Sequence, residues 1–197
     1  MIRIDLHVHT RFSSDANTSP KLIVDQLYAH PLIKGVAITD HDTLEGYLHV
    51  CRLAEAYEDI LVVPGIEFST EQGHVTVLGV EEESRRPLTV EEVVDFAKER
   101  GGLVVVPHPY RALGLGDAAR SVQVDAIEVL NARATHQENK MAERLARERN
   151  LPGVAGSDAH RPQSLWTAYT EAEAEPNVES VLDAIRRGVV KVASVRL

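Results

Sequence analysis

Short apolar runs rich in β-branched residues alternate with longer amphipathic segments along most of the chain. The runs are, in order, IRIDL, GVAI, ILVVPGI, HVTVLG, LVVV, AIEVL, GVAG and VVKVASV. Runs of this length and composition are typical of buried strands, and strands that alternate with helices pair mainly in parallel. The alternation therefore predicts an α/β fold on one largely parallel sheet, either open or closed into a barrel.

The segments between the runs carry helix start and stop signals. Proline after serine marks a first helical turn, threonine followed three residues later by glutamate is a capping box, and glycine or proline ends a helix. On these signals, helices are expected over residues 20–30, 43–57, 90–100, 136–149 and 178–188.

A single domain spanning residues 1–197 is expected, since no Ser/Gly-rich tract, charge block or internal repeat divides the chain. The net charge of −9 argues against binding long double-stranded nucleic acid, which requires a basic face. We expect no membrane association, because no apolar stretch approaches the length of a span and the N-terminus is unlike a secretory signal. A single cysteine, Cys51, suits a cytoplasmic location.

Histidine and carboxylate residues gather where the apolar runs end. The run ends carry, in order, His7 and His9; Asp40, His41 and Asp42; Glu67; His108; and Asp158 with His160. In a parallel barrel all strands end on one face, which carries the active site. Residues two apart on a strand point the same way, so His7 and His9 can bind one ion together. No glycine-rich loop supports a dinucleotide-binding sheet, so the pattern favours a barrel with a metal site at its mouth.

His74 begins a run instead of ending one. Too few residues separate Glu67 from His74 for a helical crossover, so this run is expected to return antiparallel as a hairpin. Its start then lies beside the end of the preceding strand, on the same face as Glu67. The remaining histidines lie within helix-like segments and are interpreted as surface or hydrogen-bonded residues: His30, His49 and His136.

The ordered motifs resemble those of the PHP family, named for polymerase and histidinol phosphatase domains. They read DLHVHTRFSSD, ITDHDTLEG, PGIEFS, VPHPYR and AGSDAH, and the match spans nearly the whole chain, from Ile4 to His160. Each motif alone is weak, but the ordered set is specific. The resemblance implies a distorted TIM-like (β/α)7 barrel with two to three divalent metal ions in its mouth.

The resemblance also implies which residues bind each ion. The first ion would be bound by His7, His9, Glu67 and Asp158. Glu67 would bridge to a second ion bound also by His74 and His108, and a third would be bound by Asp15, His41 and His160. The expected catalytic residues are His7, His9, Glu67, His108, Asp158 and His160.

Two positions depart from the family pattern. Asp15 stands where some relatives have histidine, so the third ion site is expected to be weaker or to prefer a harder ion. Many relatives have histidine where this chain has Thr76, and hairpin geometry assigns that ligand to His74 instead.

Imidazole and carboxylate ligands without thiolate suit Zn, Mn or Fe. A pair of such ions would lower the pKa of a shared water and neutralise charge on a phosphoryl group. Arginine binds phosphate through two parallel hydrogen bonds. The arginines beside the ligands, and hence the candidate substrate-binding residues, are Arg11, Arg111, Arg133 and Arg161.

We therefore expect a metal-dependent phosphoesterase acting on a small phosphate ester. By resemblance, TDHDTLEG points to nucleotide-like substrates or short oligonucleotides; a sugar or amino-alcohol phosphate is the other class. Two other functions stay open, namely a metal-dependent amidohydrolase and a non-catalytic, metal-stabilised binding module. The nearly complete ligand set favours an enzyme, and the sequence carries no signal for an oligomeric state.

Protein purified without chelator is expected to contain at least two transition-metal ions per chain, because potential ligands recur at successive strand ends. Elemental analysis measures this content directly. Less than one equivalent, with none taken up when Zn or Mn is added, would contradict a metal centre.

Overall fold

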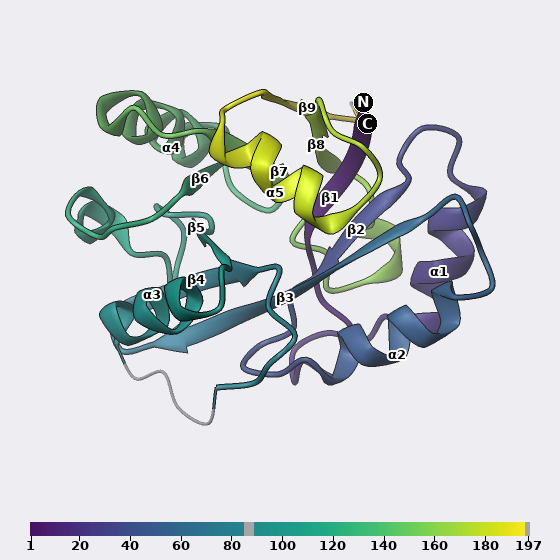
Figure 1. Ribbon diagram of the computed structural model, residues 1–197. Coiled ribbons are helices and arrows are strands. Elements are labelled where there is room, and N and C mark those ends of the chain that lie inside the picture. The colour runs from purple at the N-terminus through teal and green to yellow at the C-terminus, as the bar shows by residue number, and fades with distance from the viewer. Residues whose placement is uncertain (85–88, 196–197) are drawn as a thin grey trace.

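Strands alternate with helices around a nearly closed, barrel-shaped sheet in the computed structural model, which describes residues 1–84 and 89–195 (Figure 1). The strands are β1 (Ile2–Val8), β2 (Gly35–Ile38), β3 (Leu61–Thr70), β4 (Gly73–Leu78), β5 (Leu103–Val106), β6 (Ala126–Asn131), β7 (Gly153–Gly156), β8 (Ala168–Ala172) and β9 (Val190–Ser194). The helices are α1 (Pro20–Ala29), α2 (Glu45–Ala54), α3 (Val90–Glu99), α4 (His136–Arg149) and α5 (Val178–Arg186), with short 3-10 turns η1 (Gly116–Arg120) and η2 (Pro162–Ser164).

The strands of the described chain form one sheet in the order β7-β6-β5-β4-β3-β2-β1-β8-β9. β1, β2 and β3 pair in parallel, as do β5, β6 and β7, while β4 lies antiparallel between β3 and β5. β8 and β9 continue the sheet antiparallel beyond β1. The predicted distorted (β/α)7 barrel is confirmed, and β4 is the expected hairpin strand.

The strand β8 does not stand out in the sequence. Ala168, Thr170 and Ala172 are buried, whereas Tyr169 and Glu171 between them are partly exposed. This strand therefore alternates between two environments and forms no continuous apolar run, which was the signal that identified the other strands.

Most helices begin at residues with capping side chains. Backbone N–H groups in the first turns of α1, α3, α4 and α5 donate to the side chains of Ser19, Thr89, Thr135 and Asn177. The start of α2 is different, because the carboxylate of Glu83 accepts the N–H of Leu44 at 2.9 Å and the hydroxyl of Thr43 at 3.0 Å. No helix of the described ranges has both the length and the apolar character needed to cross a bilayer.

The core has two layers. Inside the barrel, Ile4 and Leu6 of β1 share a cluster with Val181 and Ile185 of α5, so α5 covers the amino ends of the strands (Figure 1). Outside it, α1 to α4 pack against the outward strand residues. Each large aliphatic side chain buried in this way contributes about 1.5–3 kcal/mol. The carboxyl ends of the strands, opposite α5, remain open as the barrel mouth.

β7 closes the barrel against β1. The N–H of Asp158 donates to the carbonyl of His7 at 2.8 Å, and the N–H of His9 donates to the carbonyl of Ala159 at 3.0 Å. Between β7 and β8 a side chain replaces ladder hydrogen bonds. The N–H of Ala155 donates to Thr170 Oγ1 at 2.8 Å, and this hydroxyl donates to the carbonyl of Ala155 at 3.0 Å.

A bulge redirects β1 near the mouth. Its pairing with β2 shifts register between Asp5 and Val8. As a result, the adjacent residues Leu6 and His7 both line one small space inside the barrel, although neighbouring strand residues ordinarily face opposite sides. β6 has a similar shift directly after Glu128.

Thr170→Val is expected to lower the free energy of unfolding by about 2–4 kcal/mol, because it leaves a buried N–H and a buried carbonyl without their partner. Urea denaturation measures the change. Thr170→Ser keeps the hydroxyl and should lose less. Equal stability of the valine variant and the wild type would show that the hydroxyl of Thr170 does not stabilise the contact between β7 and β8.

Candidate metal centre

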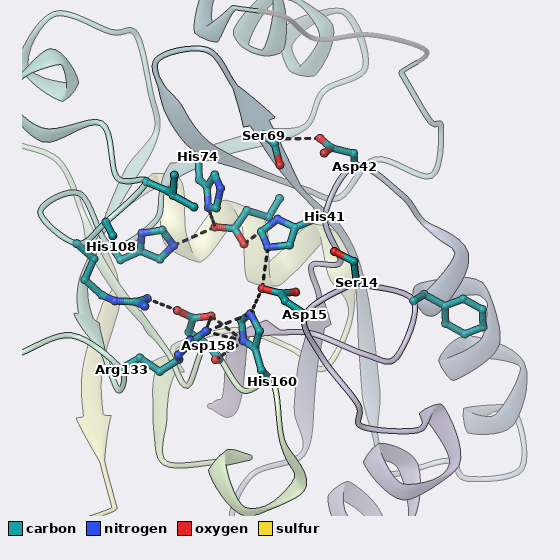
Figure 2. A pocket seen from close by; sticks show the side chains of 15 residues that line it. Ser14, Asp15, His41, Asp42, Ser69, His74, His108, Arg133, Asp158 and His160 are labelled. Carbon is teal, nitrogen blue, oxygen red and sulfur yellow. Dashed lines mark hydrogen bonds and ion pairs between the residues drawn. The ribbon is translucent and has the colours of Figure 1, made fainter.

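A cavity of about 530 Å³ opens at the barrel mouth, and side chains point into it from several strand ends (Figure 2). The predicted ligands that line it are Asp15, His41, Glu67, His74, His108, Asp158 and His160. His7 and His9 lie beneath them, with 2% and 0% of their surface exposed. The structure thus brings all the predicted ligands to one place.

Glu67 lies at the centre of this group. Its Oε2 is 3.2 Å from Nε2 of His7 and 3.1 Å from Nε2 of His9. Its Oε1 is 3.0 Å from Nδ1 of His74 and 3.0 Å from Nε2 of His108. The two carboxylate oxygens therefore face two different pairs of histidines, as they would in a carboxylate that bridges two ions.

The atoms around Glu67 Oε2 have the spacing of ligands to one ion. Nε2 of His7 and Nε2 of His9 are 3.1 Å apart, which completes a nearly equilateral triangle with Oε2. Atoms about 2.1 Å from one ion at tetrahedral or octahedral angles lie roughly 3.0–3.4 Å apart. Oδ1 of Asp158 lies 3.7 Å and 3.6 Å from the same two nitrogens. His7, His9, Glu67 and Asp158 thus fit the predicted first ion.

The charges of this cluster favour a cation. Burial alone would lower the pKa of His7, but the carboxylates of Glu128, Glu67 and Asp158 raise it well above its ordinary value. Burial would raise the pKa of Glu67, yet the neighbouring histidines, His7 foremost, hold it well below the usual range. The pKa of Asp158 falls to about 2 for the same reason, despite burial. Positive charge, from protons or metal ions, is therefore stabilised between these groups.

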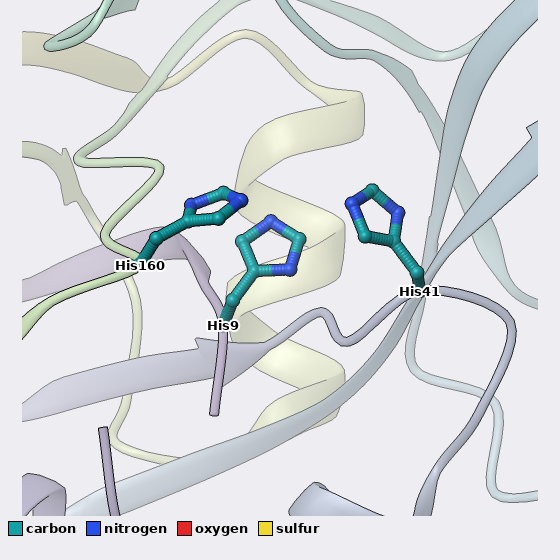
Figure 3. Close-up of side chains that lie close together, drawn as sticks. All are labelled: His9, His41 and His160. Atoms are coloured by element: carbon teal, nitrogen blue, oxygen red, sulfur yellow. The ribbon is translucent and has the colours of Figure 1, made fainter. Parts of the chain in front are cut away.

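The residues predicted for the third ion also meet. Oδ2 of Asp15 is 2.8 Å from Nε2 of His160 and 3.7 Å from Nε2 of His41. Figure 3 shows His9, His41 and His160 converging from three separate segments, with potential ligand atoms all within 4.8 Å of one another. His9 therefore lies beside this group as well as in the first.

His41 also approaches the central carboxylate of Glu67. Its Nδ1 lies 3.6 Å from Oε2 of Glu67 and is buried, with no hydrogen-bond partner in the described ranges. His41, Glu67 and His74 form a further set of ligand atoms within 4.8 Å. His41 can thus serve the second or the third ion, which sequence spacing alone did not indicate.

Two of the four predicted substrate-binding arginines line the cavity. Arg111 donates to Oδ2 of Asp158, and NH1 of Arg133 lies 3.4 Å from Oδ1 of the same carboxylate. Arg11 and Arg161 are exposed and are not among the lining residues. The positive charge available to a substrate is therefore concentrated beside Asp158.

Glu128 is a site residue that the sequence reasoning missed. Its Oε1 lies 3.1 Å from Nδ1 of His7, and its Oε2 accepts the backbone N–H of His108 at 2.8 Å and Nδ2 of Asn131 at 2.9 Å. One buried carboxylate thus orients ligands from two strands. The available signal was a glutamate inside the apolar run AIEVL.

Backbone strain is concentrated at the mouth. Asp42, His108 and Asp158 have φ values of 57°, 25° and 52°, in the region that favours glycine. Asp42 is not directed at the ligands, because its Oδ1 accepts the backbone N–H of Ser69 at 2.9 Å. Strained residues of this kind cluster at functional sites, where surrounding contacts hold them in place.

Comparison with known proteins agrees with this geometry. A model of the PHP domain matches residues 5–103, half of the chain, and a model described as PHP-associated matches residues 136–190. The chain belongs to the PHP domain family. An uncharacterized protein of Methanocaldococcus jannaschii is 33% identical over 143 residues, covering 66% of this chain and 82% of the relative.

Solved structures share the PHP fold at low sequence identity. PsfC from Pseudomonas syringae has a TM-score of 0.71 at 20% identity, covering 99% of this chain and 93% of that one. An amidohydrolase from Chromobacterium violaceum, solved with sulfate and no metal, has a TM-score of 0.67 at 19% identity, with coverage of 81% and 88%. A proposed metal-dependent phosphoesterase from Bifidobacterium adolescentis has a TM-score of 0.63 at 19% identity, with coverage of 80% and 87%.

Membership of the PHP family, together with the clustered imidazoles and carboxylates, identifies the protein as a metal-dependent hydrolase. The predicted family and fold are confirmed. The assignment of individual residues to individual ions stays a prediction.

Glu128→Gln is expected to weaken metal binding by about 10–100-fold. The amide has only one oxygen, so it cannot accept hydrogen bonds from both Nδ1–H of His7 and the backbone N–H of His108. Competition with a chromogenic chelator measures the affinity. Glu143→Gln, a change at a partly exposed residue of α4 that pairs with Lys140, is the matched control. Equal affinity in wild type and Glu128→Gln would contradict the orienting role of Glu128.

Asp15→Ala is expected to lower the metal content by one ion per chain, because Asp15 is near His41 and His160 but not near the triangle around Glu67. Asp15→His should restore the ion and shift preference toward Zn, since imidazole is the softer ligand. Elemental analysis counts the ions. Equal counts in wild type and Asp15→Ala would mean that Asp15 only stabilises its turn.

Proposed function

We propose that the protein is a metal-dependent phosphoesterase that hydrolyses a small phosphate ester. The observation that carries this proposal is the placement of two guanidinium groups, from Arg111 and Arg133, in the same cavity as the metal ligands. A neutral acyl amide brings no negative charge for two arginines to bind, whereas a phosphate ester does. The fold is shared with the proposed phosphoesterase of B. adolescentis and with the amidohydrolase of C. violaceum, so the choice between the two reactions rests on the arginines.

The protein's own residues would bind and orient the phosphoryl group. Arg111 and Arg133 each contact Asp158 through NH1, and a guanidinium carries five N–H donors, so both retain donors for phosphoryl oxygens. Divalent ions at this centre, when bound, would activate water for in-line attack and neutralise charge on the phosphoryl oxygens. Glu67, His74 and His108 would hold one side of such a pair, and His7, His9 and Asp158 the other.

The rest of the cavity suits a compact leaving group. Phe12 and Leu113 line the same cavity as the arginines, so apolar contact is available within it. A volume of about 530 Å³ is in the range of small-molecule sites. We therefore propose a nucleotide-like ester or short oligonucleotide end, with a sugar or amino-alcohol phosphate as the other substrate class.

The direct test is hydrolysis of a chromogenic phosphate ester with added Zn or Mn, followed by nucleoside monophosphates, short oligonucleotides and sugar phosphates. Turnover should stop with chelator and return with metal. His108→Ala should remove most turnover while circular dichroism stays unchanged, because apolar residues build the barrel core. Arg133→Ala should raise KM by about 10–100-fold through loss of a charge-assisted hydrogen bond, and exposed Arg161→Ala should not.

The other outcomes identify the alternative functions. Turnover of acyl amides alone would replace the proposal with an amidohydrolase. Stoichiometric metal with no turnover of either class would indicate a non-catalytic metal-stabilised module.

A further inference from the structure

The hydroxyl of Ser13 joins two predicted metal ligands that come from different strand ends. Its Oγ lies 3.1 Å from Nδ1 of His9, 3.0 Å from the backbone N of His41 and 3.0 Å from Oδ1 of Asp40. Ser13 is 2% exposed and His9 and Asp40 are fully buried. Solvent therefore does not compete for these hydrogen bonds.

The direction of each hydrogen bond follows from Asp40. Its carboxylate also accepts the N–H of Thr10 at 2.6 Å and the hydroxyl of Thr10 at 2.7 Å. An ionised carboxylate only accepts, and a serine hydroxyl has one hydrogen to donate. The hydrogen of Ser13 therefore points to Asp40, and its oxygen accepts from the His41 N–H and from Nδ1–H of His9.

This direction fixes what His9 can offer an ion. When Nδ1 carries the proton, Nε2 of the neutral ring has its lone pair free. That nitrogen is the one that lies 3.1 Å from both Nε2 of His7 and Oε2 of Glu67. The same hydroxyl anchors the backbone of His41, whose ring reaches toward Asp15.

We propose that Ser13 is a positioning residue shared by two ion sites, so that one hydroxyl sets the affinity of both. Through His9 it acts on the ion at the His7–His9–Glu67 triangle, and through His41 on the ion beside Asp15 and His160. The proposal rests on the metal centre and is independent of which ester the protein hydrolyses.

Ser13→Ala tests the proposal. Neighbouring Ser14→Ala is the matched control, because Ser14 is exposed at the cavity wall and, within the described residues, its hydroxyl makes no hydrogen bond to a predicted ligand. Metal affinities are measured by chelator competition with Zn²⁺, and ligand geometry by the visible absorption of the Co²⁺-loaded protein. We expect Ser13→Ala to weaken two ions by about 10–100-fold and to alter the Co²⁺ spectrum. Ser14→Ala should change neither.

A second variant covers the case in which Ser13→Ala does not fold. Asp40→Asn keeps the size of the side chain and can still pair with the Thr10 hydroxyl, but it offers Ser13 a neutral acceptor. It should weaken the same two ions by a smaller factor.

Unchanged affinities in a folded Ser13→Ala protein would overturn the proposal, even if its thermal stability fell, because a merely structural role predicts that pattern. Equal losses in Ser14→Ala would also overturn it. A wild type that binds no metal would overturn it together with the metal centre, whereas metal binding without ester hydrolysis would overturn only the proposed activity.

Discussion

Closure of the barrel between β1 and β7 is the constraint on which the site depends. The backbone hydrogen bonds of this seam belong to His7, His9, Asp158 and Ala159, and three of these four residues carry predicted ligands. An ion bound by their side chains would join the same two strands that their backbones join. Because ligands that are far apart in sequence meet only in the folded state, metal binding here contributes to folding free energy. The seam and the metal centre therefore reinforce each other.

Two buried carboxylates that do not line the cavity, those of Glu128 and Asp40, each orient one of the two histidines at the end of β1. Glu128 holds His7 on the β6 side, and Asp40 acts on His9 through Ser13 on the β2 side. In both cases the contact is made at Nδ1, which leaves Nε2 directed toward Glu67. The central carboxylate can thus gather imidazoles from the end of β1, from β4 and from the loop that follows β5.

Local features were predictable from pattern, and the barrel was predictable from the alternation of runs and the family resemblance, but several long-range contacts were not. Helix caps and the β3–β4 hairpin depend on short sequence separations, so pattern was enough to predict the capping box at Thr89 and the placement of Glu67 and His74 on one face of the barrel. β8 lacks an apolar run, and Glu128 differs from a surface glutamate only through burial that the closed barrel creates. Arg161 is adjacent to His160 in sequence and Arg111 follows His108 by three residues, yet only Arg111 lines the cavity. Which charged neighbour faces inward depends on loop geometry that no spacing rule gives.

The bulge in β1 divides one strand between two tasks. Ile4 and Leu6 pack in the apolar interior beside α5, whereas His7 and His9, directly after them, lie among the predicted ligands at the mouth. If the strand alternated regularly and Leu6 still faced the interior, His7 and His9 would both point to the helices outside the barrel. The extra residue of the bulge therefore allows one strand to place Ile4 and Leu6 in the core and both imidazoles at the mouth. A transplant of this centre onto another barrel must carry the irregularity along with the histidines.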